Sequence, residues 1–303
     1  YQLLFKMKES SKTNPNLRFP NFKEDWKQVK LNEVLKEHKT RNSKLEYNEV
    51  FSVAKEKGVI NQIEHLGRSY ASDDISNYKV VFPNDVIYTK SPTAGFPFGI
   101  IKQNKMNRTG VVSVLYAVFK PKNSEIGLLL DFYFSSKVNT YNYLVPIVHI
   151  GAKNTMNIGN EDFLNGRKIA LPINTDEQKK INSFFRSVDE RLIQLRTKSK
   201  LLEDYRKSII QKIFSQELKF KDDSGKPFPQ WKEMEVKKIL KRYSEPVIVD
   251  SEKYYSQIGI RSHGKGIFYK EPVQGKILGN KRVFWIKEDL LTLNIVFAWE
   301  RAI

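Results

Sequence analysis

The residues that most often catalyse reactions or hold metals are few and scattered in this sequence. Its four histidines, His38, His65, His149 and His263, lack the i, i+4 spacing of a metal-binding helix, and cysteine is absent. No glycine-rich phosphate-binding loop occurs, and "SPTAGFPFG" only hints at the Asn/Asp-Pro-Pro-aromatic run of an amino-methyltransferase. We therefore expect no catalytic residue, no metal site and no cofactor in this chain.

Lysines and arginines are the stronger functional candidates. They number 52 against 34 acidic residues, a net charge of +18, which favours a polyanion such as nucleic acid over the alternative of a merely basic soluble or ribosome-associated protein. Neither Val86–Ser124 nor Phe132–Asn160 contains an acidic residue, and both interleave cations with amides and hydroxyls, groups that suit phosphates and base edges. The predicted DNA-binding residues are Lys90, Ser91, Thr93, Lys102, Gln103, Lys105, Asn107, Arg108, Lys153, Asn154, Arg261, His263 and Lys265.

The sequence repeats its own opening. "FPNFKEDWKQVKLNEVLKE" from Phe19 is echoed by "FPQWKEMEVKKILKR" from Phe228, so that Trp26-Lys27 matches Trp231-Lys232. A tyrosine-rich extended segment follows each copy, "YNEVFSVAKEKGVI" in the first and "YYSQIGIRSHGKGIF" in the second. The same order of features in both copies indicates an internal duplication.

A long amphipathic helix is predicted between the two copies. Thr175 and Gln178 have the spacing of a capping box, and no proline or glycine falls between Pro172 and Gly225. Apolar residues with 4-3 spacing form a narrow seam along this helix. The seam needs a partner helix, because a lone helix would expose its apolar side chains to water. The alternative is an ordinary helix that lies on the surface of a domain. The seam residues are Ile181, Phe185, Val188, Leu192, Leu195, Leu202, Ile209 and Ile213.

These patterns predict an α+β protein with the long helix at its centre. β-Branched and aromatic runs such as "TGVVSVLYAVFK" predict strands in a mixed α/β domain. We expect a loose leader at 1–14, a first domain at 15–173, a coiled-coil spacer helix at 174–220 and the incomplete start of a second, similar domain at 221–303. No apolar run is long enough to span a membrane, and the absence of cysteine suits the cytoplasm.

Several motifs resemble one known family. The repeated "FP…WK" openings resemble the starts of the two target-recognition domains of type I restriction–modification specificity subunits, and the resemblance covers residues 15–303. The stretches that are similar to the family's central conserved region are "KIALP", "DEQKKI", "FFRSVDERL" and "SIIQKIFSQEL", and "DLLTLNIVFAWERAI" resembles the middle of its second recognition domain.

The resemblance implies a bacterial defence protein without catalysis of its own. Each recognition domain would read one half of a split site in double-stranded DNA, and paired antiparallel helices would set the gap. Partner methyltransferase subunits would methylate adenine with S-adenosylmethionine, and a restriction subunit would use ATP and Mg for translocation and cleavage. The family's second long helix does not occur in these 303 residues, so self-association is one way to cover the seam. The alternatives are a coiled-coil scaffold that binds nucleic acid non-specifically and the recognition part of a fused restriction–methylation enzyme.

Overall fold

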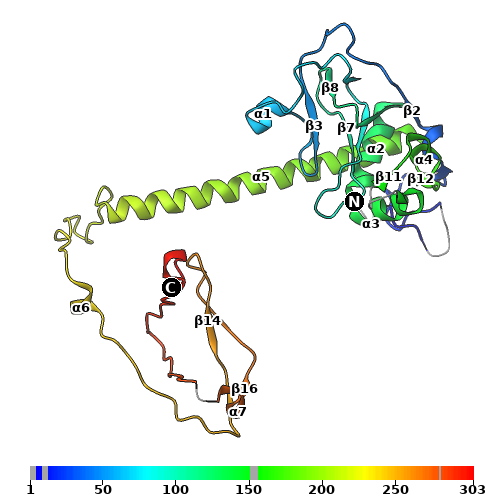
Figure 1. Ribbon diagram of the computed structural model, residues 1–303. Helices are drawn as coiled ribbons and strands as arrows, with labels where there is room; N and C mark the ends of the chain where they lie inside the picture. Colours follow the sequence, from blue (N-terminus) through cyan, green and yellow to red (C-terminus); the bar gives the residue numbers. More distant parts are fainter. Residues whose placement is uncertain (1–4, 9–12, 151–155, 280) are drawn as a thin grey trace. The chain divides into compact units, whose positions relative to one another are not determined.

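The computed structural model describes residues 5–8, 13–150, 156–279 and 281–303 (Figure 1). Both helices and strands are present, so the chain is α+β as the sequence predicts. It divides into two compact units, Tyr1–Gln211 and Lys212–Ile303. The boundary between the units falls inside the predicted spacer of 174–220, and the finer division into recognition domains and a spacer stays a prediction.

An antiparallel sheet of four strands forms the centre of the first unit. Its order is β2 (Leu35–Glu37), β9 (Ala117–Pro121), β6 (Val86–Thr89) and β7 (Ile100–Gln103). Four two-stranded pairs surround it, all antiparallel. These are β1 (Lys27–Val29) with β12 (Ile169–Leu171), β3 (Phe51–Ala54) with β4 (Gly58–Asn61), β5 (Lys79–Val81) with β8 (Gly110–Val112), and β10 (His149–Ile150) with β11 (Met156–Asn157).

Both faces of this sheet are covered. Side chains alternate along a strand, so Val86 and Tyr88 face the larger core while Ile87 faces a smaller one. Helix α2 (Ser124–Ser135) packs on the first face, and residues of β3, β4, β5 and β8 pack on the second. The shorter helices of this unit are η1 (Leu31–Glu33), α1 (Gln62–Leu66), α3 (Lys137–Leu144), η2 (Val145–Ile147) and α4 (Asn160–Asn165).

Helix α5 (Thr175–Phe214) is the predicted long helix, and Figure 1 shows it extending well beyond the sheet of the first unit. Its start differs from the predicted capping box. The side chain of Asn174 accepts hydrogen bonds from the backbone N–H groups of Asp176 and Glu177, and Gln178 donates to the carbonyl of Pro172 instead. The asparagine cap meets the N–H groups of Asp176 and Glu177, whereas the predicted threonine cap would have met that of Gln178.

A buried carboxylate fastens α5 to the first unit. Glu177 is 1% exposed and accepts two hydrogen bonds from Arg18, at 2.6 and 2.7 Å. Its Oε1 atom also accepts a 3.1 Å hydrogen bond from the indole N–H of Trp26. Because Trp26 is itself buried in the core, the first turn of the helix is fixed to both the chain's early segment and the domain interior.

The predicted seam divides into two parts. Ile181 and Phe185 are buried in the core of the first unit, so they anchor the helix rather than face a partner helix. The seam residues beyond them are exposed or partly exposed: Val188, Leu192, Leu195, Leu202, Ile209 and Ile213. Ile193, Leu201 and Tyr205 are also more than 60% exposed and lie outside the predicted seam, so the exposed apolar surface is wider than a single stripe. Their pairing in a coiled coil stays a prediction.

The second unit is made of short elements. These are α6 (Val236–Ile239), β13 (Tyr254–Tyr255), β14 (Ile258–Ile260), β15 (Ile267–Tyr269), β16 (Val273–Gln274), α7 (Gly275–Leu278) and η4 (Ala298–Glu300). Strand β13 pairs with β16, and β14 with β15. The repeated tryptophans differ in environment, because Trp231 is 57% exposed and packs against Phe214, whereas Trp26 is 1% exposed.

The Glu177 contacts lead to a stability prediction. Glu177→Gln keeps an acceptor for Trp26 but removes the charge that pairs with Arg18, and breaking a buried ion pair costs about 3 kcal/mol. Urea unfolding should show this loss in the first unit. Glu203→Gln, an exposed site on the same helix, should stay within about 0.5 kcal/mol of the natural protein. Equal stability of the two variants would contradict the role given to Glu177.

Candidate nucleic-acid interface

Two of the predicted DNA-binding residues make contacts inside the domain. Lys102 is 8% exposed, and its Nζ donates to Asp131 Oδ1 at 2.8 Å and to Ser135 Oγ at 2.6 Å. Gln103 is 2% exposed and donates to the carbonyl of Ser124. Both side chains join β7 to α2 inside the domain, which gives no support to a contact with DNA, and the assignment of Lys102 and Gln103 stays a prediction.

Carboxylates from distant segments also compensate the neighbouring cations. Lys105 Nζ lies 3.0 Å from Asp131 Oδ2. Burial would raise the pKa of Asp131, but the charges of Lys102 and Lys105 outweigh it and the pKa is lowered. Arg108 ion-pairs with Glu49 at 2.8 Å and with Glu64 at 2.6 Å. The segment 86–124 has no acidic residue of its own, but in the folded protein carboxylates from other segments lie close to its cations. Lys105 and Asn107 stay exposed, and Arg108 is partly exposed.

The loop between β6 and β7 gathers three lysines. A turn closed by reciprocal backbone hydrogen bonds between Thr93 and Phe96 shapes its tip. Lys55, from the β3–β4 turn, donates to the carbonyl of Ala94 at 3.3 Å, and Lys90 donates to the carbonyl of Ile158. Lys137, at the start of α3, lies against Gly95, where an added Cβ would come within 2.7 Å of its Cε. Lys55, Lys90 and Lys137 are called the loop cluster below.

The loop cluster has the chemistry of a phosphate-binding surface. Within the described part of the chain, none of its three lysines forms an ion pair with a carboxylate. Burial lowers the pKa of Lys90, and the nearest acids to it act at longer range. Ser91 is exposed and Thr93 partly so, which leaves hydroxyl groups beside the cations.

Of the loop cluster, only Lys90 was among the residues predicted from the sequence, together with its neighbours Ser91 and Thr93. The fold brings Lys55 and Lys137 to the loop from two other elements. Lys137 lies in the second acid-free stretch, and Lys55 lies in a Lys-Glu-Lys-Gly hairpin turn. The predicted residues Lys153 and Asn154 lie outside the described residues.

The remaining predicted residues share one turn of the second unit. Arg261, His263 and Lys265 are exposed between β14 and β15. The backbone N–H groups of His263 and Gly264 donate to the carbonyls of Glu300 and Arg301, so η4 supports the turn. Their contact with DNA stays a prediction.

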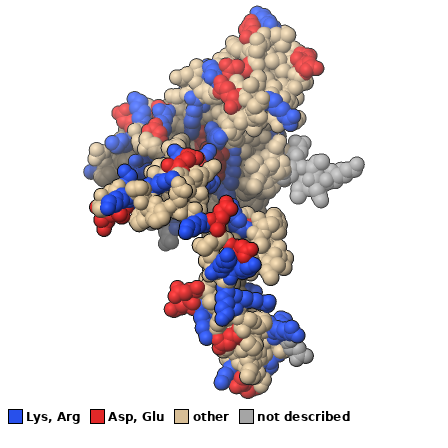
Figure 2. All heavy atoms as spheres, turned by 90° about the vertical axis from the view of Figure 1, so that its left-hand side faces the viewer, with Lys and Arg blue, Asp and Glu red and all other residues tan. Residues whose placement is uncertain are grey.

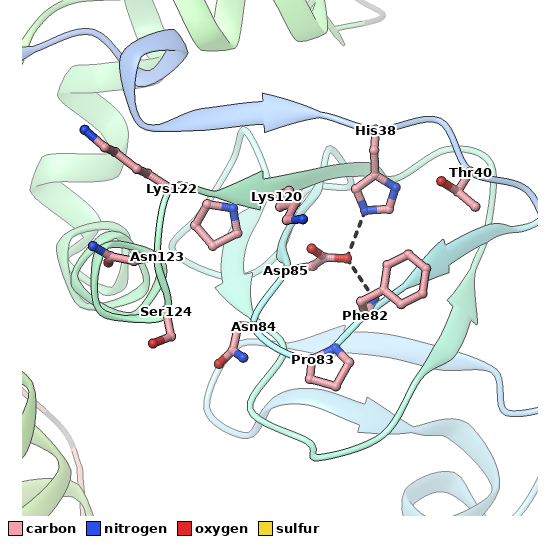
Figure 3. Close-up of a pocket in the computed structure, with 11 residues that line it drawn as sticks. His38, Thr40, Phe82, Pro83, Asn84, Asp85, Lys120, Lys122, Asn123 and Ser124 are labelled. Atoms are coloured by element: carbon pink, nitrogen blue, oxygen red, sulfur yellow. Dashed lines mark hydrogen bonds and ion pairs between the residues drawn. The ribbon is translucent and has the colours of Figure 1, made fainter.

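A pocket of about 570 Å³ opens at the opposite end of β6 from the loop cluster (Figure 3). His38 Nε2 lies 2.9 Å from Asp85 Oδ2, which also accepts a 2.7 Å hydrogen bond from the backbone N–H of Phe82. No residue of this pocket was among the predicted sites. Its lining residues are His38, Thr40, Phe82, Pro83, Asn84, Asp85, Lys120, Pro121, Lys122, Asn123 and Ser124.

The sequence matches no family model and no curated protein. None of the described helices is both long enough and apolar enough to cross a membrane. Among the described residues, no three His, Asp or Glu side chains are placed to hold a metal ion. On the face drawn in Figure 2, cationic and acidic side chains are interspersed, so net charge alone does not locate the interface.

The loop cluster gives a prediction about salt dependence. If Lys55 and Lys137 each neutralise one DNA phosphate, the double variant Lys55→Ala/Lys137→Ala should flatten the log–log salt slope of duplex binding by about 1.8. Lys23→Ala/Lys44→Ala removes the same charge from exposed sites elsewhere and should leave the slope unchanged. Fluorescence anisotropy at several salt concentrations measures both. Identical slopes for the two double variants would show that the loop cluster does not face DNA.

Proposed function

We propose that this chain is the DNA-recognition subunit of a type I restriction–modification complex. It would read a bipartite site and direct partner methyltransferase and restriction subunits to it. The observation that carries the proposal is helix α5, whose 40 residues at 1.5 Å each span about 60 Å between two copies of one motif. A helix of that length with one end fixed in a domain is suited to holding two recognition surfaces at a set distance.

The contacts at the start of α5 support the use of this helix as a ruler. Glu177, Ile181 and Phe185 fix its first turns in the first unit, so the helix leaves that unit in a defined direction. Beyond Phe185 it exposes apolar side chains on more than one side, including Leu195 and Leu201. Such a surface is stable in water only when other helices cover it. We propose that helices of partner subunits, or of a second copy of the chain, pack against these apolar side chains.

The hairpins of the two copies support recognition of two half-sites. The repeated tyrosine-rich segments form β3–β4 in the first unit and β14–β15 in the second. Each hairpin carries cations at its turn, Lys55 and Lys57 in the first and Arg261 and Lys265 in the second. We propose that the loop cluster contacts one half-site and the β14–β15 turn contacts the other. Methylation with S-adenosylmethionine and ATP-dependent cleavage would then belong to the partner subunits.

This function predicts a high ratio of specific to non-specific affinity. The assembled complex should bind its own bipartite site at least about 10³-fold more tightly than a scrambled duplex of equal length, both measured at one salt concentration. A non-specific scaffold would bind the two duplexes about equally. Adenine methylation by this polypeptide without methyltransferase subunits would instead favour a fused enzyme.

A further inference from the structure

The pocket of Figure 3 contains a largely buried carboxylate, one oxygen of which is left to solvent or a ligand. Asp85 is 3% exposed, and both of its hydrogen bonds, from His38 and from the backbone of Phe82, reach the same oxygen, Oδ2. No hydrogen bond from the described residues reaches Oδ1. Figure 3 shows this second oxygen turned away from His38 toward the side of the pocket where Lys120 lies. A ligand that donates a hydrogen bond would satisfy it.

The walls beside Asp85 are flat and partly apolar. Phe82 is 39% exposed, and the centroid of its ring lies 5.8 Å from the centroid of the His38 ring. Pro83 and Pro121 complete this part of the lining. Aromatic rings of this kind stack on the planar bases of nucleotides.

The other end of the pocket attracts anions. Here α2, a helix of 12 residues, begins at Ser124 with Asn123 as its cap. Lys120 and Lys122 are exposed beside it, and the described residues offer neither of them a carboxylate within ion-pair distance. The acid of the first turn, Glu125, is engaged by the amide of Asn182 at 2.6 Å. A helix N-terminus with two free lysines favours a phosphate group.

We propose that this pocket binds a nucleotide whose base carries an exocyclic amino group. The amino group would donate to Asp85 Oδ1, the base would lie against Phe82, and the phosphate would meet Lys120 and Lys122 at the start of α2. A phosphate alone makes no use of Asp85 Oδ1, and a base with a carbonyl in place of the amine sets an acceptor against it at that position. The volume of about 570 Å³ lies within the range of small-molecule sites. This site is independent of the proposed recognition of a bipartite sequence.

The test uses the full chain and two mononucleotides that differ at one position. Calorimetry should show that dAMP binds at least about tenfold more tightly than dIMP, in which a carbonyl replaces the amine, because one base-specific hydrogen bond discriminates by this order. Lys120→Ala/Lys122→Ala should weaken both nucleotides by a similar factor, and Lys44→Ala should weaken neither. Equal binding of dAMP and dIMP to the natural protein would overturn the proposal.

A second variant tests the acceptor itself. Asp85→Asn keeps an oxygen for the backbone of Phe82 and turns an N–H donor toward the ligand, so the preference for dAMP should disappear or reverse in favour of dIMP. An undiminished preference in the folded variant would contradict the role of Asp85. If the variant does not fold, the comparison of dAMP with dIMP on the natural protein still decides.

Two sources of the nucleotide are distinguished by further probes. Single-stranded oligodeoxyadenylate is compared with oligodeoxyinosinate in the same assay. An adenine preference with the mononucleotides assigns the site to a free nucleotide, and the same preference with the oligonucleotides alone assigns it to an unpaired nucleotide of a strand. No adenine preference with either probe pair rejects the site. Duplex binding through the loop cluster is measured separately with Lys55→Ala/Lys137→Ala, so failure of one proposal leaves the other testable.

Discussion

The arrangement of the first unit depends on one buried carboxylate, that of Glu177. A carboxylate removed from water is strongly destabilising unless hydrogen bonds and an opposite charge replace the lost hydration. Arg18 and Trp26 provide both, and they come from the segment that leads into β1. The first turn of α5 can therefore sit in only one place relative to the core. A long helix transmits this constraint along its length, which makes the direction of its exposed part a property of the domain.

Periodic features of this protein were predictable from sequence, and long-range pairings were not. The helix between the repeats follows from its apolar spacing and from the absence of proline and glycine, and the structure places it at Thr175–Phe214. The cap was assigned one residue too late, because Asn174 and Thr175 can both accept from the first N–H groups and only the chain path decides between them. The ion pair of Lys102 could not be predicted, because its partner Asp131 lies 29 residues away on α2. The number of charged residues in a stretch of sequence does not show which charges are neutralised by residues from other parts of the fold.

The two copies of the repeated motif differ in how deeply their matching tryptophans are buried. Trp26 is buried because β12 pairs with β1 and the start of α5 supplies the acceptor for its indole. Trp231 occupies the matching place in the second copy and is 57% exposed. The hairpins that follow are nevertheless alike, β3–β4 and β14–β15, since their formation depends on local turns. Among the described residues, similar hairpins thus occur in both units, while the clusters of buried apolar side chains lie in the first.

The most direct test of the account changes the length of α5. Four helix-forming residues inserted near Ser199, with a matching insertion in the helix that pairs with it, add about 6 Å of rise and re-aim what lies beyond by only about 40°. Methylated adenines are then mapped in cells that carry the complete system. At about 3.4 Å per base pair, the gap between half-sites should grow by about one or two base pairs while both half-site sequences stay the same. An unchanged gap, or different half-site bases, would contradict the role of α5 as the ruler.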